Sequence, residues 1–210
     1  MAPPQVMEPL GLAELFVFFF LMLGPLKVLV PFVQLTASAD AAQRHRTALQ
    51  ATAAAAAALI VAAVLGTAIL SRWRISLPAL ELAAGIVLFL VALRVVLEWY
   101  ERPAEPKVQP QGKAALMQIA LPGIVTPYGV AVVILVIAAA SGAERILGIA
   151  AVLAAVMVLN LLVLWFAHPL FKAVGVVPLM VLGSVLGVLQ VALGIEIILL
   201  ALRTLGVLSR

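Results

Sequence analysis

The chain has 210 residues, of which 66% are hydrophobic and only 10% are charged, and its mean hydropathy is +1.26. A water-soluble domain carries about 25% charged residues, so this composition excludes a soluble fold. The net charge of +4 is spread over short loops, which argues against nucleic-acid binding, and the absence of cysteine excludes disulfides and thiolate metal sites. We therefore expect an all-α, polytopic membrane protein.

Apolar stretches that are long enough to cross a bilayer recur along the whole chain. Crossing about 30 Å of hydrocarbon takes about 20 apolar residues in a helix. The stretches predict six transmembrane helices, at roughly 11–36, 48–71, 78–99, 114–140, 146–168 and 178–202.

The two halves of the chain carry matching landmarks about 100 residues apart. Pro25 corresponds to Pro127, and Pro78 corresponds to Pro178. This spacing predicts two three-helix repeats, at 1–102 and 114–210, joined by a linker at 103–113. A unit with an odd number of spans ends on the opposite face of the membrane, so the second copy must be inverted, as in many secondary transporters. A duplication retained only for packing remains the alternative.

Paired prolines interrupt the first and the fourth predicted spans. The stretch LMLGPLKVLVPF at 21–32 has two prolines, and so does IALPGIVTPYG at 119–129. Proline removes a backbone donor and clashes with the preceding turn, and interruptions at matching positions of two repeats indicate a transporter binding site. We expect discontinuous helices 1 and 4, with simple kinks in continuous helices as the alternative.

The interruptions have a chemistry that suits a zwitterion. Thr126-Pro127 is typical of a helix N-cap followed by proline at the first helical position, and we expect Gly24-Pro25 to act in the same way. A helix that restarts offers N–H groups to a carboxylate, and a half-helix that ends leaves carbonyls for an ammonium group or a cation. The predicted substrate-binding residues are Gly24, Pro25, Lys27, Pro122, Gly123, Thr126, Pro127 and Gly129.

Charged residues inside spans are functional candidates because burying them in hydrocarbon is costly. Lys27 is expected either to face an anion or, as the alternative, to snorkel along the break or pair with an acidic residue, for which Glu14, Glu81 and Glu196 are the candidates. Glu81 and Glu196 are also the candidates for ion or proton coupling.

The other polar residues do not form a catalytic pattern. Asn160 and Gln190 lie inside predicted spans and are expected to link helices by hydrogen bonds. His45 and His168 are far apart in the sequence, and the chain has no nucleotide-binding or hydrolase motif. We expect no enzymatic activity, no cofactor and no metal site.

The chain resembles the MarC family of bacterial and archaeal inner-membrane proteins. The family's Asn/Asp-Pro-x-Gly-Asn-x-Pro-x-Phe motif corresponds to GPLKVLVPF at 24–32, and its arginine-rich loop corresponds to AAQRHRTAL at 41–49. The family's P-x-x-A-G-P motif corresponds to PGIVTP at 122–127.

This resemblance implies two inverted three-span repeats in a bacterial inner membrane, with both termini periplasmic. It also implies transport of small neutral amino acids, the role described for an archaeal branch. The chain departs from the family pattern at Gly24, Lys27 and Val28 in the first motif and at Val125-Thr126 in the second. The cation introduced by Lys27 would favour a more negative ligand or take the place of a coupling cation.

The resulting hypothesis is a secondary transporter or exchanger of small neutral amino acids or similar metabolites. Its expected partners are the lipid bilayer and the small-molecule substrate, with H⁺ or Na⁺ as candidate coupling ions; a homo-oligomer is left open. Two alternatives remain: a non-transporting membrane scaffold or partner subunit, and a channel or lipid flippase.

Overall fold

The computed structural model describes residues 11–97 and 113–208, and every regular element within those ranges is helical. The predicted all-α class is therefore confirmed for this part of the chain. The elements are α1 (Leu12–Leu23), α2 (Leu26–Leu35), α3 (Ala41–Trp73), α4 (Leu77–Leu97), α5 (Lys113–Gln118), the π-helix η1 (Ile119–Ile124), α6 (Pro127–Ala138), α7 (Ala143–Trp165), α8 (Ala167–Val174) and α9 (Val176–Thr204).

Five of the described segments are long and apolar enough to cross a membrane. They are Leu12–Leu35, which joins α1 and α2, and Ala41–Trp73, Leu77–Leu97, Ala143–Trp165 and Val177–Thr204. The predicted linker at 103–113 falls almost wholly outside the described residues. The remaining predicted span, 114–140, is divided among α5, η1 and α6, and α6 has only 12 residues. No single helix in that stretch has the length of a span, because the chain is interrupted there.

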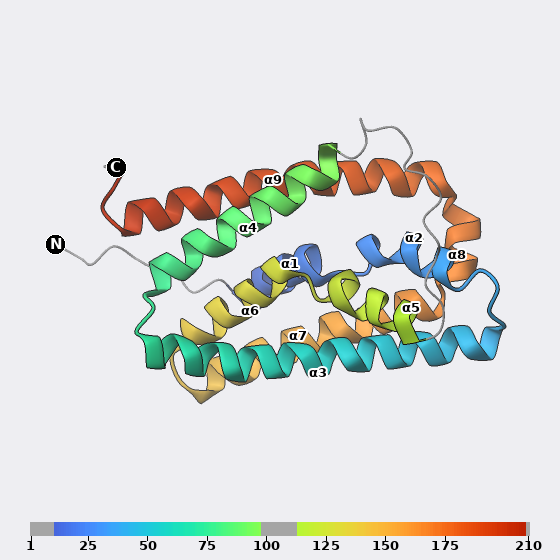
Figure 1. Ribbon diagram of the computed structural model, residues 1–210, viewed down its shortest axis with the longest axis horizontal. Coiled ribbons are helices and arrows are strands. Elements are labelled where there is room, and N and C mark those ends of the chain that lie inside the picture. Colours follow the sequence, from blue (N-terminus) through green and yellow to red (C-terminus); the bar gives the residue numbers. More distant parts are fainter. Residues whose placement is uncertain (1–10, 98–112, 209–210) are drawn as a thin grey trace.

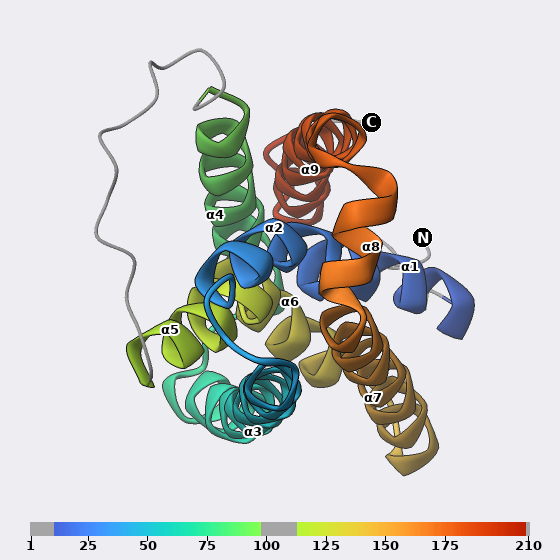
Figure 2. The ribbon, with the colours of Figure 1, turned by 90° about the vertical axis from the view of Figure 1, so that its right-hand side faces the viewer.

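The interrupted segments lie at the centre of the molecule. Figure 1 shows α1, α2, α5 and α6 in a middle layer, between the α4–α9 pair on one side and α3 with α7 on the other. The end-on view in Figure 2 shows the same arrangement. In the most apolar part of α1–α2, 44% of the residues are buried, against 17% in α3. The broken helices are thus shielded by the continuous ones.

The α4–α9 pair is held in close contact by glycines. A Cβ atom on Gly194 of α9 would lie 2.8 Å from the backbone nitrogen of Phe89, and one on Gly85 of α4 would lie 3.0 Å from the Gly194 carbonyl oxygen. Neither residue has room for a side chain. Small residues of this kind let helix backbones approach closely. Close packing stabilises helix pairs in lipid, because moving apolar side chains from lipid into a helix interface gives little hydrophobic free energy.

Two helices differ in extent from the spans predicted for them. The predicted span 48–71 is part of a 33-residue helix that begins at Ala41, because Asp40 caps it by accepting a hydrogen bond from the Gln43 backbone nitrogen at 2.7 Å. At 1.5 Å per residue this helix is about 50 Å long, so it extends beyond the hydrocarbon. The predicted span 146–168 ends at Trp165, and α8 follows it.

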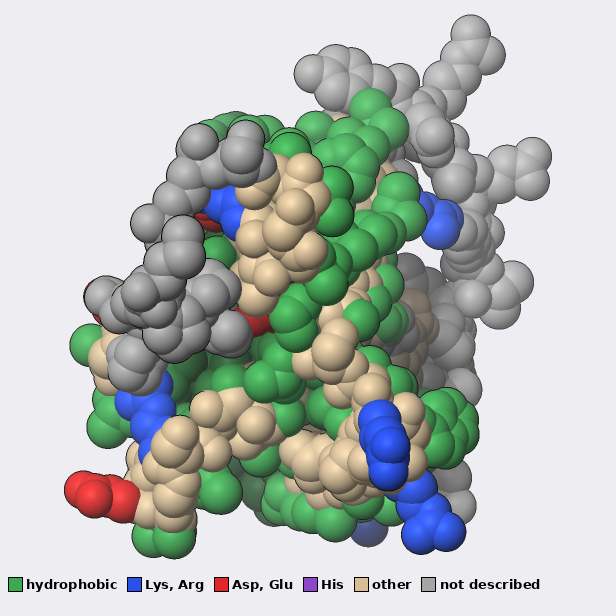
Figure 3. Space-filling model, turned by 90° about the vertical axis from the view of Figure 1, so that its left-hand side faces the viewer, with side chains coloured by type: hydrophobic (Ala, Val, Ile, Leu, Met, Phe, Trp, Pro, Cys, Tyr) green, Lys and Arg blue, Asp and Glu red, His purple; other side chains and the backbone are tan. Residues whose placement is uncertain are grey.

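The outer surface fits a lipid environment. Large apolar side chains are exposed along the continuous helices, among them Ile60, Val64, Leu147 and Val181. In Figure 3 basic side chains stand out from a largely apolar surface at one end of the molecule. Arg72 and Arg74, at the end of α3, are exposed there. An apolar belt between charged ends is the surface that a bilayer requires.

Candidate functional site: two helix breaks in contact

The first break separates α1 from α2 at Gly24 and Pro25. Gly24 has an extended backbone, with ψ of 161°, so the chain leaves the helical path immediately after Leu23. Pro25 has no N–H and therefore cannot donate to the Leu21 carbonyl four residues earlier. The change of direction also separates the Met22 and Leu23 carbonyls from the N–H groups that would have reached them. Three consecutive carbonyls consequently need other donors.

Side chains from three other helices supply those donors. Gln190 of α9 donates Nε2–H to the Leu21 oxygen at 2.6 Å. Lys27 of α2 donates from Nζ to the Met22 oxygen at 2.5 Å. Asn160 of α7 donates Nδ2–H to the Leu23 oxygen at 2.8 Å. The expected linking role of Asn160 and Gln190 therefore takes a specific form, in which both residues satisfy the end of a broken helix.

The second break lies between η1 and α6. Leu121, within the π-helical turn, has the non-helical angles φ −135° and ψ 114°, and Val125 is extended. Thr126 then caps α6 by accepting a hydrogen bond from the Gly129 backbone nitrogen at 3.1 Å, and Pro127 occupies the first turn. The structure has the N-cap that Thr126-Pro127 predicted.

The matching break at Gly24-Pro25 has the expected backbone but no side-chain cap. Gly24 is extended, as an N-cap residue is, and Pro25 already has helical angles at the start of α2. Gly24 has no side-chain oxygen to accept from the first N–H groups of α2, so it cannot act as Thr126 does. The two breaks are therefore capped differently.

The structure brings the two breaks together. A Cβ atom on Gly129 would overlap the Leu23 side chain, and one on Gly123 would lie 3.6 Å from Cγ1 of Val28. The Thr126 hydroxyl also lies 3.5 Å from the Met22 oxygen, at the limit of a hydrogen bond.

The predicted prolines differ in position. Pro25 is buried, Pro127 is exposed at the start of α6, and Pro122 lies within η1.

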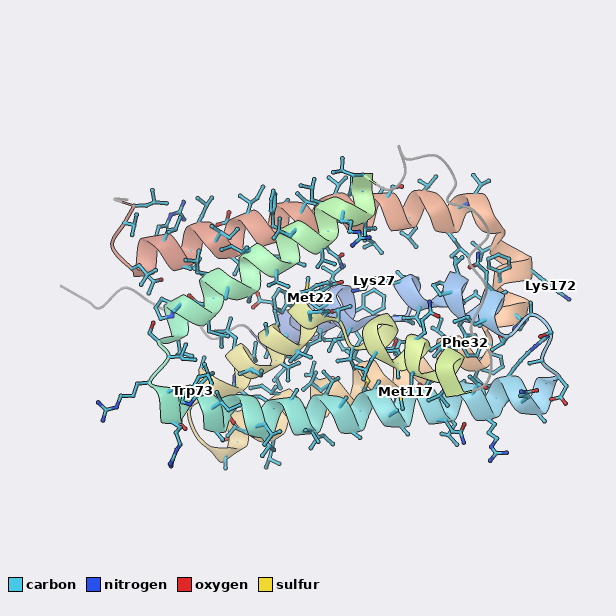
Figure 4. The ribbon with its side chains drawn as sticks, viewed as in Figure 1. Met22, Lys27, Phe32, Trp73, Met117 and Lys172 are labelled. Carbon is cyan, nitrogen blue, oxygen red and sulfur yellow. The ribbon has the colours of Figure 1, made fainter. Side chains whose placement is uncertain are left out.

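Lys27 connects the breaks directly. Its Nζ donates to the hydroxyl oxygen of Tyr128 at 2.6 Å and lies 4.8 Å from the centroid of the Tyr128 ring. Figure 4 shows Lys27 beside Met22 near the middle of the molecule. Of the alternatives expected for Lys27, the structure has the side chain lying along the break and not paired with an acidic residue, since the hydrogen-bond partners of its ammonium group are neutral oxygens. One of the expected partners, Glu14, accepts from the Gly11 backbone nitrogen at 2.8 Å instead.

Asn160 leaves one buried atom without a partner. Its side chain is fully buried, and Oδ1 has no hydrogen-bond partner among the described residues. The amide orientation is fixed by its surroundings, because Nδ2 faces the carbonyl oxygens of Leu23 and Val156 at 2.8 and 2.9 Å. An unpartnered oxygen acceptor therefore lies beside the end of α1.

The two glutamates proposed for coupling have opposite environments. Glu81 in α4 is 1% exposed, and its Oε2 has no hydrogen-bond partner among the described residues. Glu196 in α9 is exposed. Only Glu81 is enclosed by the protein, so the pair is not equivalent.

Tyr128 is the functional candidate that the sequence reasoning missed. A signal was present, because Lys27 and Tyr128 are 101 residues apart, close to the separation of about 100 residues between the landmarks of the two halves. Tyrosine next to a proline break offers both a hydroxyl oxygen and an aromatic face to a cation.

Cavities open on other parts of the described surface. An apolar cavity of about 620 Å³ lies between α3 and α7, lined by Leu59, Ala63 and Leu153 among others. Two cavities of about 540 Å³ lie near Arg74 and near Arg46. None of these three is lined by a residue of the breaks.

Comparison with known proteins identifies relatives. A family model described as "MarC family integral membrane protein" matches residues 11–205. The inner membrane protein MarC of Citrobacter koseri is 22% identical over 120 residues, which cover 53% of this chain and 54% of that protein. The match thus spans about half the length of this curated relative. No solved structure matches the chain.

Proposed function

Because the chain belongs to the MarC family of integral membrane proteins, we propose that it is a secondary transporter or exchanger of small neutral amino acids or similarly small zwitterions. The observation that carries this proposal is the contact between the two helix breaks, made by Lys27 and Tyr128 at 2.6 Å. The protein acts by binding and moving its substrate, without an enzymatic step. The name of its Citrobacter relative supports an inner-membrane location.

The breaks offer both charges that a zwitterion needs. The α1 end carries carbonyl oxygens and the negative end of a helix dipole, which favour an ammonium group. A substrate ammonium group would take the place of one of the side-chain donors that hold these carbonyls. The α6 start at Thr126 presents the positive end of a helix dipole, which favours a carboxylate. Thr126 lies 3.5 Å from the Met22 oxygen, so the two ends are close enough for one small molecule to reach both.

The arrangement of the helices supports two inverted three-span repeats, with α5, η1 and α6 together forming the remaining span. In Figure 1, α1–α2 and α5–α6 run in opposite directions, as do α3 and α7, and α4 and α9. Opposite directions are what an inverted second copy would have. In this proposal both termini are periplasmic, and the start of α3 and α8 face the cytoplasm.

Coupling to H⁺ is proposed to involve Glu81, with Glu196 as the second candidate. A carboxyl group 1% exposed in a membrane helix is costly to keep ionised. Binding and release of a proton at Glu81 would then accompany substrate movement.

Uptake by purified protein in liposomes tests the function. Labelled glycine, alanine and serine are supplied outside, with a proton gradient, a Na⁺ gradient or unlabelled substrate inside, and protein-free liposomes provide the background. We expect uptake of at least one of the three, and a loss of uptake in Gly129→Ala, because a Cβ atom there would lie 2.8 Å from the Thr126 hydroxyl oxygen. Gly183→Ala is the matched control, since nothing lies within 4 Å of a Cβ atom at that position.

The alternatives give different results in the same liposomes. An ion conductance without saturable uptake would identify a channel, and movement of labelled lipid between leaflets would identify a flippase. Complete inactivity towards amino acids, ions and lipids would leave a scaffold and would overturn the transport proposal.

A further inference from the structure

We propose that the end of α1 is a monovalent-cation site whose resident occupant is the ammonium group of Lys27, so that transport does not require Na⁺. The first half of this inference stands on the geometry of the break. The second half, concerning Na⁺, rests on the proposed transport function.

The position of Lys27 is explained by α1 rather than by its own helix. Lys27 lies in the first turn of α2, where the positive end of the helix dipole repels a cation. Its side chain turns back instead, to the carbonyl end of α1, and donates to the Met22 oxygen. That end carries the negative part of the α1 dipole, so it attracts the same charge that α2 disfavours.

The groups around the ammonium group are those of a cation site. The Met22 carbonyl and the Tyr128 hydroxyl supply neutral oxygens, and the Tyr128 ring supplies a π face at 4.8 Å. Met22 and Tyr128 are 0% and 2% exposed, so water competes little for the charge. Carbonyl oxygens at an unwound helix end are the ligands that transporters use for coupling cations.

A second, independent observation is a further buried oxygen acceptor, on the side chain that binds the neighbouring carbonyl of α1. Asn160 Oδ1 is fully buried and unpartnered among the described residues, and the same amide group holds the next carbonyl of α1, that of Leu23. Buried acceptors of this kind normally have a partner. The oxygen set at the end of α1 therefore exceeds what the Lys27 ammonium group alone satisfies.

The first test truncates the resident cation and replaces it from solution. Lys27→Ala removes three carbons and the ammonium group, which together correspond to n-propylammonium. Thermal unfolding of the purified full chain is measured with n-propylammonium chloride, sodium chloride or tetramethylammonium chloride at equal ionic strength. Tetramethylammonium is the control, because it has the charge but no N–H to donate.

We expect the variant to unfold several degrees below the wild type and to recover with n-propylammonium but not with tetramethylammonium. The wild type and Lys27→Met should not respond, since their side chains fill the space. Sodium should restore part of the stability if the site accepts alkali ions, which would identify the site as general for monovalent cations. Recovery that is equal with all three salts would overturn the inference.

A second variant keeps the test decisive if Lys27→Ala does not fold. The chain contains no cysteine, so Lys27→Cys carries a single thiol. Its thiolate displaces bromide from 2-bromoethylamine and forms S-(2-aminoethyl)cysteine, which restores the ammonium group at the length of lysine. Alkylation with iodoacetamide is the neutral control, and mass spectrometry gives the extent of each reaction. We expect only the aminoethylated protein to regain wild-type stability; equal stability of the two adducts would overturn the inference.

Transport measurements separate this inference from the proposed function. Wild-type uptake that is unchanged when Na⁺ is replaced by tetramethylammonium supports both. Amino acid uptake that requires Na⁺ would overturn the resident-cation inference and leave the transport function intact. Rescue of stability by n-propylammonium in a protein that transports nothing would support the site and reject the function.

Discussion

The Asn160 side-chain nitrogen lies 2.8 Å from the Leu23 carbonyl oxygen, so a helix from the second half of the chain completes the broken helix of the first half. Asn160→Leu keeps a similar volume but leaves that buried carbonyl without a donor. We expect a loss of about 1–3 kcal/mol in unfolding free energy, measured by denaturant or thermal unfolding in detergent. Leu162→Ala, on the same helix and 50% exposed, is the control. Equal effects of the two changes would show that the cap contributes nothing specific.

The Thr126 cap is tested with one variant that removes the hydroxyl group and one that keeps it. Thr126→Ala removes the acceptor of the Gly129 N–H, and the loss of such a cap costs about 0.5–2 kcal/mol. Thr126→Ser retains the oxygen and should remain within about 0.5 kcal/mol of the wild type. The comparison uses the same unfolding assay, and an unstable serine variant would contradict the capping role.

The close crossing of α4 and α9 predicts unequal tolerance at two glycines of the same helix. A Cβ atom at Gly194 would lie 2.8 Å from a backbone atom of Phe89, which cannot rotate away, whereas nothing lies within 4 Å of one at Gly183. We expect Gly194→Ala to destabilise by about 1–3 kcal/mol. Gly183→Ala should be neutral or gain up to about 1 kcal/mol from higher helix propensity. Equal thermal midpoints would show that the two helices do not pack as described.

His168 predicts a pH dependence at the end of the molecule where α8 lies. The Thr36 hydroxyl donates to the Phe32 oxygen at 2.7 Å, so the neutral imidazole donates Nε2–H to Thr36 at 2.9 Å. Burial, with the nearby charges of Arg44 and Lys172, lowers the pKa of His168 from its ordinary value of 6.5. Just below pH 6.5, therefore, His168 binds a proton more readily in the unfolded chain than in the folded chain.

The sign of the effect follows from that difference. Stability from His168 is complete above about pH 6.5 and is lost as the pH falls below that value. We expect the thermal midpoint of the wild type to fall more between pH 7 and pH 5 than that of His168→Gln, whose amide can still donate to Thr36. Parallel pH profiles for the two proteins would contradict the assignment.

Glu81→Gln tests whether the buried carboxyl group carries a proton. Glutamine has the same size and cannot ionise, so we expect a folded protein that no longer responds to a proton gradient but still exchanges substrate between the two sides of a liposome. Glu196→Gln, at an exposed position, should retain gradient-driven uptake. Undiminished proton-driven uptake by Glu81→Gln would remove Glu81 from the coupling step.

The sequence predicted the helices well wherever apolar composition alone determines them. The predicted spans at 78–99 and 178–202 correspond closely to α4 and α9. A helix needs about 20 apolar residues to cross the hydrocarbon, whichever other helices it packs against. The capping of α6 was also predictable, because Thr126-Pro127 specifies it locally. These features depend on residues that are adjacent in the chain.

Features that depend on distant residues were not predictable. The polar start of α3 reads as a loop, but Asp40 caps it and the helix continues into water. The partner of Lys27 was left open between an anion, the break itself and an acidic residue, because a sequence does not show which groups the fold brings to the ammonium group. Tyr128 became a candidate only when the fold placed it 2.6 Å from the ammonium group.

The three carbonyls at the end of α1 also link conformational change to hydrogen-bond exchange. Their donors belong to α9, α2 and α7, so any of these helices that shifts against α1 must release one hydrogen bond and find a substitute. Each hydrogen bond from the Gln190 or Asn160 amide contributes about 0.5–1.5 kcal/mol, and the one from the charged Lys27 about 1.5–3 kcal/mol. Collective helix motions in proteins occur within microseconds to milliseconds, and a shift of α2, α7 or α9 against α1 would belong to that class.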